Sequence, residues 1–183
     1  MNASQIVEFL LLIVVAGVVG TGGMTFVMYL INKMGVTNAR MVIAIGSILT
    51  KTRENAIRVG LIMHFTAGTT FAILYAIFFS LFGISGLLQF VAVGFGFGFI
   101  HGFVMSFVLV IAVAEHHPLE EFRDAGFAVA IAHVVGHLVY GTLVGLVIGL
   151  SGILNTKSIN ASAGKASTPN IHLQANGPIP SKR

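Results

Sequence analysis

Charged residues are confined to short segments of the chain, and three long stretches between them contain no Asp, Glu, Lys or Arg. These stretches lie between Glu8 and Lys33, between Arg58 and Glu115, and between Asp124 and Lys157. A transmembrane helix needs roughly 20 predominantly apolar residues, so the first and third stretches each predict one span. The middle stretch is about twice as long as one span requires and predicts two.

A turn between the two middle spans is indicated by Gly83-Ile84-Ser85-Gly86, at the centre of the middle stretch, because Gly and Ser interrupt helices. Four transmembrane helices are therefore predicted, near residues 6–32, 57–82, 87–114 and 124–152. The composition agrees, with 56% hydrophobic and only 9% charged residues, which excludes an ordinary soluble domain. We expect an all-α polytopic membrane protein whose four-helix transmembrane domain covers residues 1–153.

The segment between the first two spans carries a shorter apolar pattern over about residues 38–52. Its hydrophobic positions recur at helical spacing, at Met41, Val42, Ile45, Ile48 and Leu49. Basic residues flank the pattern. We therefore expect a short amphipathic helix in the membrane interface, with its basic ends near lipid headgroups.

Most Lys and Arg residues gather on one side of the predicted spans. They are Lys33, Arg40, Lys51, Arg53, Arg58 and Arg123. Basic residues in short loops favour the cytoplasmic side, so we expect this side to be cytoplasmic and both termini to be non-cytoplasmic. This topology signal explains the net charge of +4. The sequence contains no basic patch interleaved with aromatic residues, so nothing in it indicates nucleic-acid binding.

Residues 154–183 differ in composition from the rest of the chain. They are rich in Asn, Ser, Ala, Gly and Thr, and they contain Pro169, Pro178 and Pro180 with few bulky residues. Such a segment cannot bury enough apolar surface to order itself. We predict a polar extramembrane tail, which is a candidate contact for other membrane-protein subunits.

Small residues recur every four positions in three of the predicted spans. The rows are Gly60, His64, Gly68, Ala72 and Ala76 in the second span, Gly94, Gly98 and Gly102 in the third, and His133, His137, Gly141, Gly145 and Gly149 in the fourth. Residues four apart share one face of a helix, and small residues allow close helix contacts inside lipid. The rows are therefore predicted to be helix contact faces.

The second and fourth spans resemble each other over a short stretch. His64, Gly68 and Thr69 in one correspond to His137, Gly141 and Thr142 in the other. This correspondence suggests a duplicated two-helix unit, with copies related by an axis along the membrane normal.

Several short motifs are distributed over roughly residues 10–150. They are Gly20-x-x-x-Met24-Thr25, Ile45-Gly46-Ser47, His101-Gly102 and His137-x-x-Tyr140-Gly141-x-x-x-Gly145. Together with His64 in the second span, they resemble a family of uncharacterised bacterial four-helix membrane proteins, a domain of unknown function. The resemblance implies four helices and a bacterial inner membrane. It brings no activity with it and does not include the tail.

Four histidines lie within the predicted spans, where ionisable side chains are costly and usually face the protein interior. They are His64, His101, His133 and His137. Imidazole is a usual axial ligand of haem iron, and neighbouring glycines leave room for a flat ring. The four are therefore candidate cofactor-binding residues for haem b or a (bacterio)chlorophyll, with His101–His137 and His64–His133 as candidate bis-histidine pairs. Alternatively, the imidazoles are neutral and hydrogen-bonded to hydroxyl groups of neighbouring helices.

A second cluster, Glu115-His116-His117-Pro118-Leu119-Glu120-Glu121, follows the third span. Carboxylates and imidazoles together suit iron, zinc, manganese or copper, so Glu115, His116, His117 and Glu120 are candidate metal ligands. Adjacent histidines cannot both point inward from a regular helix, and one is expected to face outward. The alternative is a solvated loop whose proline and acidic residues begin the last helix.

These features leave three classes of function open. The favoured class is a small subunit of an electron-transfer or photosynthetic membrane complex, which acts as a scaffold and holds a haem or chlorophyll-type cofactor. The alternative is a proton or metal-ion transporter, although the three charge-free stretches contain no Asp, Glu or Pro of the kind that transporters use. A membrane enzyme is least favoured, because no nucleophile–base pair or phosphate-binding loop is recognisable. We expect no catalytic activity of the chain's own.

Overall fold

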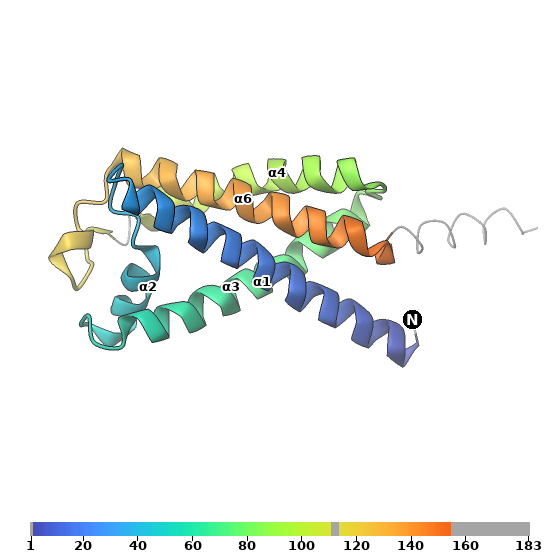
Figure 1. Cartoon of the computed structure of the whole chain (residues 1–183), viewed down its shortest axis with the longest axis horizontal. Coiled ribbons are helices and arrows are strands. Elements are labelled where there is room, and N and C mark those ends of the chain that lie inside the picture. Colours follow the sequence, from blue (N-terminus) through green and yellow to red (C-terminus); the bar gives the residue numbers. More distant parts are fainter. Residues whose placement is uncertain (1, 111–113, 155–183) are drawn as a thin grey trace, which may run out of the picture.

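Four long helices and one short helix dominate the computed structural model, which describes residues 2–110 and 114–154. The elements are α1 (Ala3–Lys33), α2 (Met41–Thr50), α3 (Ala56–Leu81), α4 (Leu87–Val104), the π-helix η1 (Met105–Val110), the 3-10 helix η2 (Glu120–Phe122) and α6 (Phe127–Ser151) (Figure 1). Four helices are long and apolar enough to cross a membrane. The predicted all-α fold with four spans and a short connecting helix is confirmed. Residues 155–183 of the predicted tail, and the contacts expected for it, lie outside the described residues.

The turn predicted between the middle spans connects α3 to α4. Gly83 has a φ of 60° and Gly86 a φ of 87°, a backbone region that residues with a Cβ rarely adopt. The backbone N–H of Ser85 donates to the side-chain oxygen of Gln89 at 3.1 Å. Glycine at the two bends and this local hydrogen bond together explain why the chain reverses here.

The third span differs from its prediction near its end. The α-helical hydrogen bonding of α4 stops at Val104, and the chain continues as η1 through Val110. A π-helix inserts extra backbone into each turn and often lies at a functional site. Here Met105 and Val110 of η1 line the cavity described below.

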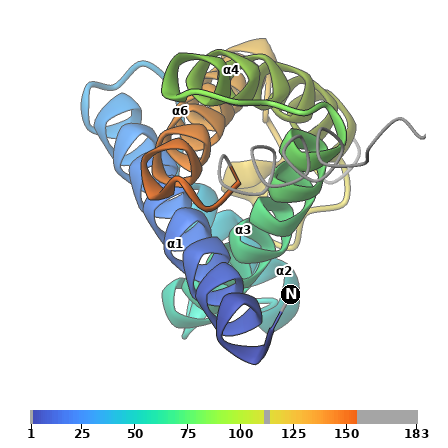
Figure 2. The ribbon, with the colours of Figure 1, turned by 90° about the vertical axis from the view of Figure 1, so that its right-hand side faces the viewer.

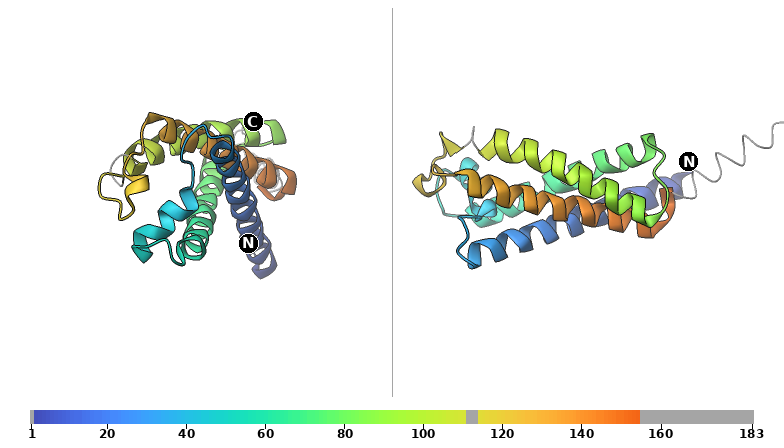
Figure 3. Two further views of the ribbon diagram at one scale, coloured as in Figure 1. Left: turned by 60° about the vertical axis from the view of Figure 1, so that its left-hand side comes forward. Right: turned by 90° about the horizontal axis from the view of Figure 1, so that it is seen from above.

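Helices α4 and α6 run antiparallel and side by side along most of their length (Figures 1 and 3). A Cβ added to Gly98 would lie 2.5 Å from the carbonyl oxygen of His137, and one added to Gly102 would lie 2.6 Å from His137 Cβ. Gly94 and Gly141 each face the other's carbonyl oxygen. The two predicted small-residue rows are therefore one contact face, along which the backbones touch.

The row on α3 is also a contact face, but it meets other partners. Gly60 packs on the backbone of Val42 in α2, and Gly68 packs on the side chain of Thr21 in α1. Ala72 and Ala76 are buried in the core. The prediction that these rows are contact faces is thus confirmed for all three helices.

Helix α3 diverges from α4 and α6 toward the end of the bundle where α2 lies (Figure 1). At the opposite end the helices converge around a filled core, where the rings of Phe79 and Phe90 meet edge to face at 5.2 Å and Ile148 is buried. Because α1 packs closely on α6 whereas α3 and α4 barely touch, the arrangement does not show the symmetry that a simple duplication suggests. The result is a wedge, wide at the end that carries the basic residues.

Many outward-facing side chains of the long helices are large and apolar. Examples are Ile6, Leu10, Leu11, Ile62, Phe95, Phe99, Ile100 and Phe103. So much exposed apolar surface is unfavourable in water and is normal where lipid surrounds a helix bundle. The chain is therefore a multi-pass membrane protein by length, composition and surface.

A matched pair of glycine substitutions on α4 tests the contact with α6. We expect Gly94→Ala to lower the free energy of unfolding by about 1–3 kcal/mol, because its methyl group would collide with the Gly141 carbonyl in a packed interface. Gly96→Ala on the same helix meets no atom within 4 Å and should leave stability unchanged or slightly higher. Unfolding by denaturing detergent in mixed micelles measures both. Equal effects would show that α4 and α6 do not touch along this row.

Candidate functional site: a histidine-lined cavity

A cavity of about 370 Å³ occupies the wide end of the wedge. Its walls come from the long helices, from α2, and from the cap segment, which we define as residues 114–126 preceding α6. Figure 2 looks along the bundle and shows the helices arranged around this region. His64, His101, His133 and His137 all line the cavity. The structure thus brings the four candidate cofactor-binding residues to one space inside the protein.

The hydrogen bonds of His133 and His137 determine which ring nitrogen is left as an acceptor. Nδ1 of His133 lies 2.9 Å from the carbonyl oxygen of Val129, and Nδ1 of His137 lies 2.7 Å from that of His133. A carbonyl oxygen can only accept, so each Nδ1 carries the proton and each neutral ring keeps a lone pair on Nε2. Histidines that bind metals commonly donate their other N–H in this way.

His64 and His101 have unsatisfied ring nitrogens. In the described part of the chain, Nε2 of each is buried and has no hydrogen-bond partner. His101 Nδ1 lies 3.5 Å from the Tyr75 hydroxyl, which is a long contact. Because a buried polar group without a partner is costly, each Nε2 is a position where a bound molecule would supply the missing interaction.

The alternative of inter-helix hydrogen bonding gains little support from the described hydroxyl groups. Thr142 donates to the carbonyl of Leu138 on its own helix, and the Ser106 hydroxyl is buried without a partner. Tyr140 joins α6 to α3 by donating to the Gly68 carbonyl at 2.5 Å. Among the described residues, only the long Tyr75 contact connects a hydroxyl to one of the four imidazoles.

The two candidate bis-histidine pairs differ in geometry. The rings of His101 and His137 meet edge to face, with centroids 4.7 Å apart, on helices whose backbones touch at Gly98 and Gly102. The two rings are in direct contact, so no space for a macrocycle separates them in this structure. His64 and His133 lie on α3 and α6, which diverge here (Figure 1), and both line the cavity.

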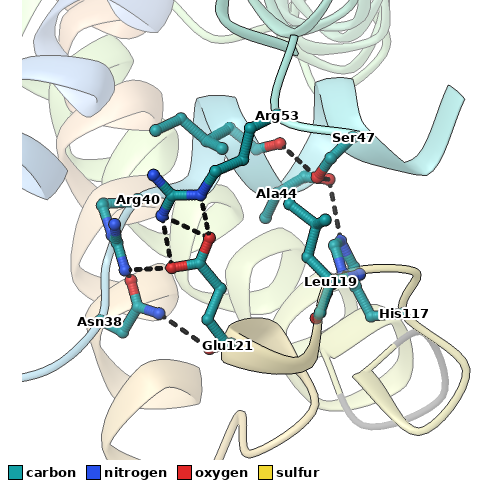
Figure 4. Close-up of polar contacts among 9 residues, drawn as sticks. Asn38, Arg40, Ala44, Ser47, Arg53, His117, Leu119 and Glu121 are labelled. Atoms are coloured by element: carbon teal, nitrogen blue, oxygen red, sulfur yellow. Dashed lines mark hydrogen bonds and ion pairs between the residues drawn. The ribbon is translucent and has the colours of Figure 1, made fainter. Parts of the chain in front are cut away.

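The cap segment is held onto the helix ends by a clamp around Glu121 (Figure 4). Arg53 donates to the Glu121 carboxylate through Nε at 2.7 Å and also through Nη2. Arg40 donates to the same carboxylate, and the Asn38 side chain donates to the Glu121 backbone carbonyl at 3.0 Å. The clamp therefore ties the cap segment to the residues on both sides of α2.

His117 forms a second attachment. It is only 3% exposed. Its Nε2 lies 3.0 Å from the Ala44 carbonyl, and its Nδ1 accepts from the Leu119 N–H at 3.1 Å. His116 is exposed, so the prediction that only one of the two adjacent histidines faces inward is confirmed.

The structure does not assemble the predicted metal site at Glu115, His116, His117 and Glu120. No three His, Asp or Glu side chains of residues 2–110 and 114–154 converge in a way that could hold a metal ion. Both ring nitrogens of His117 are engaged with backbone groups, whereas Glu115 and Glu120 are exposed. The attachment to α2 and to Leu119 thus occupies the two nitrogens with which His117 would bind a metal.

Helix α2 has a larger role than a connector at the membrane surface. Met41, Ile45 and Ile48 line the cavity, and only Leu49 of the predicted apolar positions is exposed. Arg40 and Arg53 bind Glu121, although the sequence predicted basic ends near lipid headgroups. The predicted amphipathic helix is present, and its apolar face borders the cavity.

Comparisons with family models, with curated proteins and with solved structures find no match to this chain. The resemblance to uncharacterised bacterial four-helix proteins stays a prediction from short motifs. Function therefore has to be argued from the cavity itself.

Removing the Glu121 carboxylate tests the clamp. Hydrogen bonding from Arg53 lowers the pKa of Glu121 below its ordinary value of 4.5, and Arg40 acts in the same direction, against partial burial. Because the folded-state pKa is the lower one, ionised Glu121 stabilises the fold above pH 4.5, and this contribution is lost as the pH falls through the folded-state value. Since the partners are partly exposed, we expect Glu121→Gln to cost roughly 1 kcal/mol or less at neutral pH.

Thermal unfolding in detergent, at neutral pH and well below pH 4.5, measures this effect. The difference between wild type and Glu121→Gln should vanish at the lower pH. Glu120→Gln is the control, since this neighbour is exposed and should have no effect at either pH. A pH-independent difference for Glu121→Gln would contradict the clamp.

Proposed function

We propose that the chain is a membrane subunit that holds a metal macrocycle of the haem or chlorophyll type in its histidine-lined cavity. The observation that carries the proposal is the state of His133, whose Nδ1–H is bound to a backbone carbonyl and whose Nε2 lone pair is left for the cavity. His133 lies on the cavity wall and is not in contact with His101, unlike His137. His133 is therefore the proposed axial ligand, and His64 on the opposite wall is the proposed second ligand.

The shape and lining of the cavity support a bound molecule. Ligand sites are typically about 300–1,000 Å³ and mainly apolar, with a few polar groups that fix orientation. This cavity has about 370 Å³, and Met24, Met63, Phe71 and Met105 contribute apolar walls between the imidazoles. Residues of this kind suit the faces of a flat apolar ring.

The position of the cavity favours a site that holds a bound molecule over a route that carries protons or metal ions across the membrane. It lies at the wide end of the wedge, and toward the other end the space between the helices is filled by Tyr75, Phe79 and Phe90. A transporter needs a route that can open to both sides of the membrane, whereas a storage or cofactor site does not. The proton or metal-ion transporter is for this reason the second choice.

The surroundings proposed for this subunit are a bacterial inner membrane and a larger electron-transfer or photosynthetic complex. Lys33, Arg40, Lys51, Arg53 and Arg58 lie at the end of the bundle where α2 lies (Figure 1). The positive-inside rule then favours a cytoplasmic cavity end and two non-cytoplasmic termini. A reporter fused to the C-terminus that is active only outside the cytoplasm tests this orientation.

The absorption spectrum of the purified protein, oxidised and reduced, tests the proposal. Haem or chlorophyll bands are expected in protein from native membranes, or after addition of haemin to protein purified without it. We expect His133→Ala to lose most of the bound pigment, because it removes the ligand nitrogen while leaving the other residues of the cavity wall in place. Pigment content per protein measures the loss.

The matched control is His116→Ala, which removes an exposed imidazole of the cap segment and should leave the spectrum unchanged. Mild-detergent purification adds a test of the complex, since a subunit should copurify with its partners in fixed ratio. A protein that stays colourless in the presence of haemin and chlorophyll would refute the cofactor proposal. Proton flux through the same protein in liposomes would then support the transporter.

A further inference from the structure

A macrocycle bound through histidine does not by itself require the charged side chain of Arg40, which also lines the cavity. Arg40 lies just before α2 and lines the cavity together with Asn38, Glu121 and Asp124. Its Nε donates to the Asn38 side-chain oxygen at 3.0 Å, and its Nη2 donates to Glu121. A guanidinium group carries five N–H donors, so these two bonds leave donors that are available to a molecule in the cavity.

The charges around Glu121 leave Arg40 only partly neutralised. The Glu121 carboxylate is bound by Arg53 through Nε and Nη2 and also by Arg40. Two guanidinium groups therefore share one carboxylate, which leaves one positive charge in the group. The other acidic residue of the lining, Asp124, is exposed and follows the basic Arg123 in the sequence.

Arg40 and His133 line the same cavity from different elements. His133 is six residues inside α6 from its first residue, Phe127, which corresponds to a rise of about 9 Å. Arg40 is on the connection that covers this end of the bundle, where it is 36% exposed.

Resting on the proposed function, we infer that Arg40 is a specificity-determining residue that selects macrocycles with free carboxylates. The metal would lie toward His133, and the carboxylates would lie at the wide end of the cavity, where Arg40 donates to them. Arginine pairs with carboxylates through charge-assisted hydrogen bonds of fixed geometry. The ligand class is therefore a haem-type porphyrin with free acid groups, in preference to a chlorophyll-type ring whose acid groups are esterified.

The experiment compares haemin with its dimethyl ester, which has the same ring and metal but no free carboxylates. Binding to the full-length protein in detergent is followed by the shift of the main absorption band. Wild type should bind haemin about tenfold more tightly than the ester, which is the size expected for one charge-assisted contact. Arg40→Gln should remove this preference by weakening haemin binding alone.

Two further variants separate selection by Arg40 from its structural role in the clamp. Arg53→Gln weakens the clamp but leaves Arg40 bound to Glu121, so it should retain the preference for haemin. Lys51→Gln removes an exposed basic residue of the same connection and should also retain it. If Arg40→Gln weakens both ligands equally, or if Arg53→Gln loses the preference in the same way, Arg40 does not select the ligand.

The two proposals fail in distinguishable ways. Equal binding of haemin and its ester to wild type would overturn the inference about Arg40 and leave the macrocycle site standing. Absence of binding for both ligands would overturn the proposed function, and the inference with it.

Discussion

The backbone contact between α4 and α6 is the constraint on which the rest of the structure depends. Inside lipid, helices are not driven together by hydrophobicity, so close contact has to come from small residues that let backbones touch. Gly94, Gly98 and Gly141 provide that contact, and it places His101 directly against His137. The same row of small residues therefore sets both the packing of the bundle and the position of two of its buried imidazoles.

The cavity exists because α3 does not follow α4 and α6. It packs on α1 and α2 through its own small residues and diverges toward the basic end of the bundle (Figure 1). The opening is closed by α2 and the cap segment, which are joined at Glu121 and His117 (Figure 4). Partly exposed ion pairs are individually weak, so the wall on this side is less firmly held than the glycine contact.

The sequence predicted the helices and contact faces well because both depend on local patterns. Charge-free stretches defined the spans, Gly83 and Gly86 marked the turn, and four-residue spacing identified the faces that pack. The cavity could not be predicted, since it depends on the angle between α3 and its neighbours. The Glu121 clamp was missed for a similar reason, because Arg40 and Arg53 are about 70–80 residues away along the chain. The described residues do not bring the predicted metal ligands around His117 together, and sequence spacing could not show that backbone groups contact both of its ring nitrogens.

We propose that the wide end of the wedge holds a flat ligand between α3 and α6. A density map of the protein purified from its native membrane would show whether this is so. We expect planar density in the cavity, joined to Nε2 of His133, with α3 separated from α4. Density showing α3 packed against α4, with the four imidazoles hydrogen-bonded to one another and no space between them, would contradict it.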